Sequence, residues 1–219
     1  MVRIVLVPTS HIASQSVKKV KDVIEKENPD CVAVELDMNR LMSFNKKQGT
    51  NMQAIRALGP TTFLVFWVMK KLQEWLGKQV GILPGSDMVT AVKVARQKEI
   101  KVALIDQNIA MTFNSIQKIP FREKAKLLWF LLRGVTLGWL LSKLGKGKEI
   151  DLSKLPPAEV IEQAMELLRK EFPYLHKALV VDRNKYMVKN IKHLATKFKR
   201  IVVVIGAGHH KGIEKLLSK

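Results

Sequence analysis

Four short apolar segments, rich in β-branched residues, are the clearest feature of the hydrophobic pattern along this chain. They lie at residues 4–7, 31–34, 102–105 and 201–205. Each segment is almost continuously apolar and is bounded by a charged residue or a turn, which is typical of parallel strands that are buried on both faces. The pattern therefore predicts four central strands of one sheet.

Helical patterns occupy most of the chain between these strands. They cover residues 16–27, a long middle region from 51 to 97, and a further stretch from 121 to 198. The turn at Pro84-Gly85 favours a helix that continues through Arg96, and the prolines at positions 156 and 157 favour another that continues through Lys170.

Strands that alternate with helices predict an α/β fold, with a mainly parallel central sheet and helices on both faces. A chain of 219 residues is long enough for one such domain with a sizeable core. Because the last strand lies far from the others in the sequence, we expect a largely helical insertion at roughly residues 108–200. The predicted organisation is one domain over residues 1–219.

Polar residues follow each predicted strand at the point where the chain leaves the sheet. They are His11 after the first strand, Glu35 after the second, Asp106 after the third and His209 after the fourth. Ligands of open parallel sheets bind in the crevice beyond the carboxyl ends of the strands, so these side chains are candidates to converge there. Polar residues also end strands simply because the chain turns into solvent, and the sequence leaves both interpretations open.

The candidate cluster has the donor types of a divalent-metal site. Two imidazoles and one or two carboxylates can bind Zn²⁺, Mn²⁺ or Co²⁺ and leave one coordination position for water. A bound metal lowers the pKa of that water, and a nearby carboxylate can act as the general base. The strand ends therefore predict a hydrolytic crevice.

The glycines after the last strand have two interpretations. Gly206, Gly208 and Gly212 superficially resemble a dinucleotide-binding fingerprint, but the third glycine comes one residue late, so we disfavour nucleotide binding. The favoured interpretation is that these glycines let the backbone turn sharply. His209 would then lie at the positive end of a final helix over residues 211–219, where the field favours the neutral imidazole that binds metals.

Composition narrows the class of protein. The hydrophobic content of 47% excludes an intrinsically disordered chain. The single cysteine, Cys31, excludes an intramolecular disulfide framework, and its apolar neighbours predict a buried core position. The first residues lack the length and the cleavage site of a signal peptide, so we expect a cytoplasmic location.

The net charge of +19, from 38 Lys and Arg against 19 Asp and Glu, indicates either an anionic partner or a solvated basic surface. Nucleic acid, anionic lipid headgroups and acidic peptides are the candidate partners. The basic residues are spread along the chain, and the sequence contains no zinc-finger spacing, helix-turn-helix pattern or aromatic strand pair. We therefore disfavour nucleic acid, and a solvated lysine-rich surface is the simplest interpretation.

Two apolar stretches raise the question of a membrane. Residues 61–69 are too few to span a bilayer, and residues 127–141 are also too few and carry Arg133 near their centre. The second stretch also contains Gly134 and Gly138. We expect it to be a buried core helix, a contact in a homodimer, or an interfacial helix that makes peripheral contact with an anionic membrane.

Beyond these patterns, the sequence resembles the TraB family, a pheromone-shutdown group that is related to the Tiki-type and GumN-like proteins. The resemblance rests on motifs that occur in the family's order over essentially the whole chain. They are Pro8-Thr9-Ser10-His11, Val34-Glu35-Leu36-Asp37 with Arg40, Pro84-Gly85-Ser86-Asp87-Met88, Leu104-Ile105-Asp106, Arg183-Asn184-Lys185-Tyr186-Met187 and Gly206-Ala207-Gly208-His209-His210-Lys211-Gly212.

The resemblance implies a chemistry as well as a fold. Tiki-type relatives are metal-dependent peptidases, whereas the TraB branch is linked to the blocking of small peptide signals. The residues so implied are His11, Glu35 and His209 as metal ligands, the same three with Asp106 as catalytic residues, and Arg40, Arg183 and Asp87 as groups that bind or orient the substrate.

The sequence departs from the family pattern at four positions. Pro8 replaces a glycine and removes a backbone N–H donor, and Asp87 replaces a glutamate and so shortens the reach of the carboxylate. Gln107 and Asn108 replace an arginine–aspartate pair directly after Asp106. The residues implied as metal ligands are all retained.

Two functions from different classes follow. The first is a metal-dependent, peptidase-like hydrolase with a strand-end His/Glu/His site, in which Glu35 is either a third ligand or the base that activates water. The alternative is a non-catalytic protein that binds a peptide or an acidic partner, with peripheral membrane contact. Some TraB-family proteins carry membrane segments beyond the shared domain, and because this sequence ends shortly after Gly212 we expect it to comprise the core domain alone.

Overall fold

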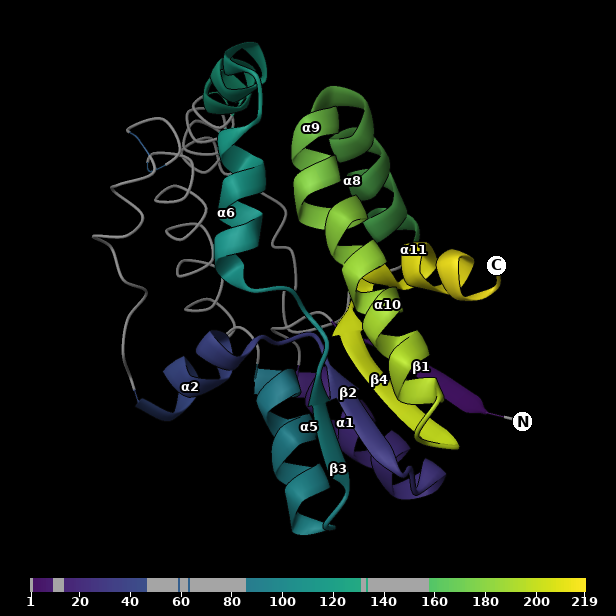
Figure 1. Ribbon diagram of the computed structural model, residues 1–219. Coiled ribbons are helices and arrows are strands. Elements are labelled where there is room, and N and C mark those ends of the chain that lie inside the picture. The colour runs from purple at the N-terminus through teal and green to yellow at the C-terminus, as the bar shows by residue number, and fades with distance from the viewer. Residues whose placement is uncertain are drawn as a thin grey trace, which may run out of the picture.

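A computed structural model of the chain describes residues 2–9, 14–46, 59, 63, 86–130, 133 and 158–219. Within these residues the strands form one parallel sheet in the order β1-β4-β2-β3 (Figure 1). The strands are β1 (Arg3–Thr9), β2 (Cys31–Val34), β3 (Lys101–Leu104) and β4 (Arg200–Gly206). The four predicted strands and the parallel α/β fold are therefore confirmed.

The sheet is buried on both faces, and each face has its own core. One core joins the sheet to α1 (Ser14–Glu27) and α5 (Ser86–Gln97). The other joins it to α10 (Asp182–Ala195) and α11 (Ala207–Leu217). In β2, for example, Val32 and Val34 belong to the first core and Cys31 and Ala33 to the second. The continuous apolar pattern of the strands follows from this burial on both sides.

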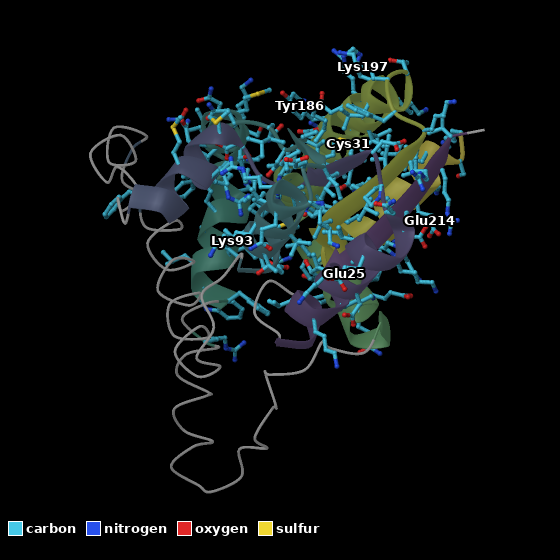
Figure 2. The ribbon with its side chains drawn as sticks, turned by 90° about the horizontal axis from the view of Figure 1, so that it is seen from below. Glu25, Cys31, Lys93, Tyr186, Lys197 and Glu214 are labelled. Carbon is cyan, nitrogen blue, oxygen red and sulfur yellow. The ribbon has the colours of Figure 1, made fainter. Side chains whose placement is uncertain are left out.

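Cys31 occupies the core position that its apolar neighbours predicted. Its side chain is buried, and Figure 2 shows it among the helices and strands, while Lys197 and Glu214 lie at the periphery. Burial raises the pKa of the Cys31 thiol to about 11, with a smaller contribution from the charge of Asp30. The thiol is therefore protonated and unreactive near neutral pH.

Further helices lie beyond the edge of the sheet at which the strands end (Figure 1). They are α2 (Met38–Lys46), α6 (Ile109–Gln117), the helical residues 121–130, α8 (Ala158–Glu171), α9 (Pro173–His176) and the π-helix η1 (Lys177–Val181). The π-helix continues directly into α10. A third apolar cluster, which includes Leu127, Phe172 and Leu175, joins helices of this layer. The described residues of the stretch 108–200 are thus mostly helical, and one of the helices, α10, also covers the sheet.

Several sequence predictions lie wholly or mainly outside the described residues. They concern residues 61–69, most of residues 127–141, the turn at 84–85, the prolines at 156–157 and His11. Among the helices that the structure describes, none combines the length and the apolar character needed to cross a bilayer.

Candidate functional site

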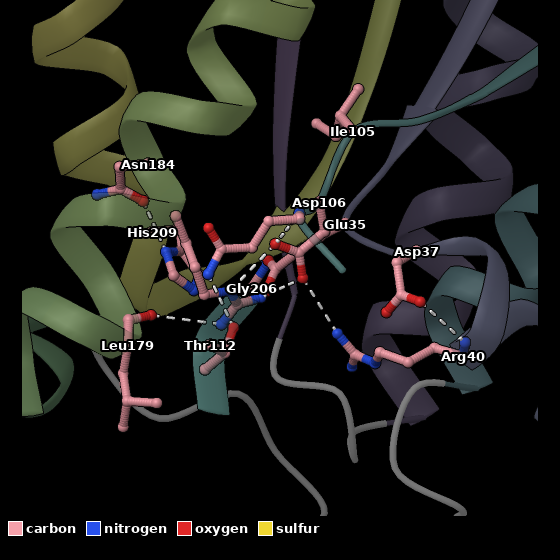
Figure 3. A network of polar contacts seen from close by, with 12 residues as sticks. Glu35, Asp37, Arg40, Ile105, Asp106, Thr112, Leu179, Asn184, Gly206 and His209 are labelled. Atoms are coloured by element: carbon pink, nitrogen blue, oxygen red, sulfur yellow. Dashed lines mark hydrogen bonds and ion pairs between the residues drawn. The ribbon is translucent and has the colours of Figure 1, made fainter. Parts of the chain in front are cut away.

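Three buried polar side chains gather at the edge of the sheet where the strands end (Figure 3). Glu35 directly follows β2, Asp106 lies just after β3, and His209 lies in the first turn of α11, which directly follows β4. Their residues are only 2%, 7% and 7% exposed, respectively. The parallel arrangement of β2, β3 and β4 brings them together although they are far apart in the sequence.

The guanidinium of Arg183 connects the two carboxylates. Its Nε and Nη2 donate to Oδ1 and Oδ2 of Asp106 at 3.1 and 2.7 Å, and Nη2 also donates to Oε1 of Glu35. Arg183 lies in the first turn of α10, and its side chain is largely buried. Burial opposes the charge, but Glu35 and Asp106 together raise the pKa of Arg183 above its ordinary value. These ion pairs fix the orientation of both carboxylates.

The two oxygens of Glu35 have different surroundings. Oε2 accepts the backbone N–H of Gly206 at 2.6 Å, because Glu35 and Gly206 end neighbouring strands. Oε1, which contacts Arg183, also lies 3.3 Å from Nε2 of His209. The carboxylate is therefore held by the backbone on one side and directed at the imidazole on the other.

Asn184, to which the sequence analysis gave no role, contacts the other side of His209. Its Oδ1 lies 2.6 Å from Nδ1 of the imidazole, and both residues are buried. Asn184 directly follows Arg183, so one turn of α10 supplies contacts to both Glu35 and His209. The only signal for Asn184 in the sequence was its position directly after Arg183. The residue that Asn184 contacts, His209, lies in a different element.

Asp37 and Arg40 extend the network toward α2. Oδ1 of Asp37 accepts the backbone N–H groups of Asn39 at 2.9 Å and of Arg40 at 3.3 Å, so Asp37 caps the N-terminus of this helix. Nη1 of Arg40 lies 3.3 Å from Oδ2 of Asp106. The side chain of Arg40 is 35% exposed, so Arg40 reaches the network from the solvent side.

The residues that replace the arginine–aspartate pair after Asp106 both make local contacts. The backbone N–H of Gln107 donates to Oδ1 of Asp106 at 2.9 Å. Oδ1 of Asn108 accepts a backbone N–H of α6 at 2.9 Å and caps that helix. Arg40 and Arg183 supply the positive charge beside Asp106 that Gln107 lacks.

Pro8 is accommodated because β1 lies at the edge of the described sheet, where it pairs with β4 alone. The N–H of Arg3 donates to the carbonyl of Lys199 on the β4 side. Successive residues of a strand direct their N–H groups to opposite sides, so the nitrogen of Pro8 faces away from β4. The missing donor therefore costs the sheet no hydrogen bond.

The contacts given above include neither of the two remaining predicted site residues, Asp87 and His11. Asp87 is buried in the first turn of α5, on the sheet face opposite α10 and α11, where its Oδ1 accepts the backbone N–H of Met88 at 2.9 Å. His11 follows β1 and lies outside the described residues. The structure thus joins Glu35 to Arg40, Asp106, Arg183 and His209 through the contacts above.

The start of the last helix corrects one prediction. The helix α11 begins at Ala207, four residues before the predicted start at Lys211, and so includes His209. The chain turns from β4 directly into α11, and Gly206 there has the extended backbone angles φ −62° and ψ 141°, which any residue adopts, so its conformation does not require glycine. Gly208 and Gly212 instead lie within the helix, at points where Met165 and Asn184 approach it closely.

A groove of about 950 Å³ lies beside the network, between α8, η1, α10 and α11. Met165 and Val181 belong to its walls, and so do Pro8, Asn184 and Gly208, which adjoin the strand ends. The volume is within the range of small-ligand sites in proteins. The arrangement thus places a space of ligand size next to buried, oriented polar groups.

The comparison with protein families decides the relationship that the motifs indicated. The sequence profile described as the TraB/PrgY/gumN family matches residues 2–219. The chain belongs to this family. The motifs that meet in the network all lie within the residues that this family profile matches.

Individual relatives support the same assignment. An uncharacterized protein of Methanocaldococcus jannaschii is 30% identical over 220 residues, which cover 99% of this chain and 53% of that protein. TraB domain-containing proteins of Mus musculus and Homo sapiens are 27% and 26% identical over 97% of this chain and 62% of their own length. This TraB-family chain therefore spans between 53% and 62% of the length of these relatives.

The donor atoms of this TraB-family site can be compared with what a metal requires. Among the described residues, no group of three His, Cys, Asp or Glu side chains is arranged to hold an ion. Glu35 Oε1 and His209 Nε2, however, are 3.3 Å apart. Two ligands of one tetrahedral ion, each about 2.0–2.1 Å from it, lie about 3.3 Å from each other. The pair therefore fits two positions of one ion, and the third predicted ligand is His11.

Proposed function

We propose that this TraB-family protein is a metal-dependent hydrolase with peptidase-like activity and that Glu35 and His209 form its centre. The observation that carries the proposal is the 3.3 Å approach of Glu35 Oε1 to His209 Nε2 at the carboxyl edge of the parallel sheet. Both side chains are buried. Glu35 accepts a hydrogen bond from the backbone N–H of Gly206, and Nδ1 of His209 contacts Oδ1 of Asn184. Oriented donors of this kind are what a catalytic metal site needs.

The other residues of the network have roles that follow from their contacts. Asp106 binds two nitrogens of Arg183, which in turn orients Glu35 and offsets its charge. Arg40 is partly exposed and is placed to bind a carboxylate or carbonyl oxygen of a substrate. Glu35, His209 and His11 would hold a Mn²⁺, Co²⁺ or Zn²⁺ ion, which when bound supplies a Lewis acid and a water of lowered pKa.

A protein that binds a peptide or an acidic partner without catalysis is the second candidate. It is favoured by the contacts of Arg183, which compensate Glu35 and Asp106 in the way that a purely structural ion-pair network does. In this case Arg40 and the groove would recognise the partner, and the net charge of +19 would attract it.

A turnover measurement separates the two candidates. The folded protein, loaded in turn with Mn²⁺, Co²⁺ and Zn²⁺, is incubated with a library of peptides, and the products are identified by mass spectrometry. We expect the wild type to cleave peptides and Glu35→Gln and His209→Ala to be slower by about 100-fold or more.

The matched control is His193→Ala, which alters an exposed histidine of α10 outside the network and is expected to cleave peptides at the wild-type rate. Failure of the folded, metal-loaded wild type to cleave any peptide of the library would overturn the hydrolase and favour the binding protein. Retention of ligand affinity by Glu35→Gln together with loss of turnover is the result that only an enzyme gives.

A further inference from the structure

The contact between Asn184 and His209 determines which imidazole nitrogen carries a proton. Nδ1 of His209 lies 2.6 Å from the amide oxygen of Asn184. An amide oxygen can only accept a hydrogen bond, so with Oδ1 of Asn184 directed at the ring, as it is here, Nδ1 is the donor. In the neutral ring Nε2 then carries no proton and directs its lone pair toward Glu35.

This arrangement places two acceptors opposite each other. Nε2 of His209 and Oε1 of Glu35 are 3.3 Å apart, and in the neutral ring neither carries a proton. Such a pair is stabilised when a proton or a metal cation lies between the two atoms. Asn184 therefore favours the tautomer in which Nε2 of His209 and Oε1 of Glu35 both present a lone pair.

Gly212 provides the space that Asn184 occupies. It lies three residues after His209 in α11, so the two residues share a face of that helix. A Cβ at position 212 would come closer than 3.0 Å to the amide nitrogen of Asn184, a separation that real Cβ atoms essentially never show. Asn184 is 4% exposed and the same amide group contacts His209, so a shift that makes room for this Cβ would alter that contact.

Gly208 lies in the same helix but has a different neighbour. A Cβ at this position would meet the sulfur of Met165 at 3.3 Å. A methionine side chain is flexible and can adjust by a few tenths of an ångström without any effect on Asn184. Gly208 and Gly212 thus form a matched pair for comparison, because only Gly212 leaves the space that Asn184 occupies beside His209.

We infer that Asn184 is a positioning residue, which keeps the proton of His209 on Nδ1 and presents Nε2 beside Glu35, and that position 212 requires glycine because Asn184 fills the place of its Cβ. The tautomer depends only on the contacts of this chain. Its consequence for metal affinity rests on the proposed function. The two parts are therefore tested by separate measurements.

The first measurement is nitrogen NMR of the metal-free protein with ¹⁵N-labelled histidine, in which the signals of His209 are identified by their loss in His209→Ala. We expect a proton on Nδ1 in the wild type, whether the ring is neutral or cationic. Asn184→Asp, which keeps an accepting oxygen, is expected to retain this pattern, and Asn184→Leu is expected to lose the preference. A wild-type ring with its proton on Nε2 alone, or an unchanged pattern in Asn184→Leu, would overturn the inference.

The second measurement is the affinity for Co²⁺, made on variants whose folding has been compared with the wild type by circular dichroism. Loss of the group that orients a metal-binding histidine typically weakens metal binding by about 10–100-fold. We expect this loss in both Asn184→Leu and Gly212→Ala. If one of these variants does not fold, the other still tests the prediction. We expect Asn184→Asp and Gly208→Ala to bind Co²⁺ nearly as the wild type does.

Two results would overturn the metal-affinity part of the inference. One is wild-type affinity in Asn184→Leu, and the other is equal weakening by Gly208→Ala and Gly212→Ala. A wild type that binds no Co²⁺ would instead contradict the proposed metal site, and the NMR result would still decide whether Asn184 positions His209.

Discussion

Arg183 is the residue on which both buried carboxylates of the site depend. It contacts Glu35 and two oxygens of Asp106, and the side chains of these acidic residues are each 3% exposed. A buried carboxylate without a partner is strongly destabilising, because it loses its hydration and gains nothing in return. Arg183 therefore determines whether the site can exist in a folded chain.

Removal of Arg183 is expected to reduce the stability of the protein. We predict that Arg183→Met lowers the free energy of unfolding by about 3–5 kcal/mol, since it leaves Glu35 and Asp106 without their common partner. Urea denaturation followed by circular dichroism measures this change. The control is Arg169→Met, which removes an exposed ion pair with Glu166 and is expected to leave the free energy of unfolding almost unchanged. Equal losses in the two variants would contradict the role of Arg183.

Single residues of the site could be predicted where a simple local signal marked them. Glu35, Asp106 and His209 follow apolar strands, and the topology of a parallel sheet brings such residues together. Asn184 carried no such signal, because its importance arises from a tertiary contact between α10 and α11. The local sequence also does not show that Arg40 and Arg183 both form ion pairs with Asp106. These ion pairs supply the positive charge that is lost because Gln107 replaces an arginine.

The elements were predicted where burial alone determines them. Each strand is apolar over most of its length because helices cover both faces of the sheet, so its position could be predicted from the sequence. The start of α11 was predicted too late, since Gly206, Gly208 and Gly212 have low intrinsic helix propensity. Packing against Asn184 requires a residue without a Cβ at position 212, and this tertiary requirement outweighs the propensity.

The helix α6 offers a test at the scale of one element. Its N-cap is Asn108, whose Oδ1 accepts the N–H of Ala110 at 2.9 Å. We predict that Asn108→Ala lowers the free energy of unfolding by about 1 kcal/mol, because a backbone donor loses its partner, and that Asn108→Ser largely retains the stability. Urea denaturation checks both variants. An alanine variant as stable as the wild type would contradict the contribution of the cap.

At the scale of the whole molecule, the parallel sheet explains why distant motifs meet. The order β1-β4-β2-β3 places the ends of β2 and β4 side by side, with α10 and α11 on one face, so that four separate segments contribute to one network. The α/β class could be predicted from the alternation of strands and helices. The way in which α8, η1 and α11 enclose a groove beside that network could not, because it depends on contacts between helices that are not neighbours in the sequence.

The central claim is that His209 and Glu35 of this TraB-family chain hold one divalent cation, and equilibrium dialysis tests it most directly. The folded wild type is dialysed against Mn²⁺, Co²⁺ or Zn²⁺, and the bound metal per chain is determined by mass spectrometry. We expect stoichiometric binding by the wild type and by His193→Ala, and loss of binding in His209→Ala, Glu35→Gln and His11→Ala. A folded wild type that binds none of the three metals, or a His209→Ala variant that binds them as the wild type does, would contradict the account.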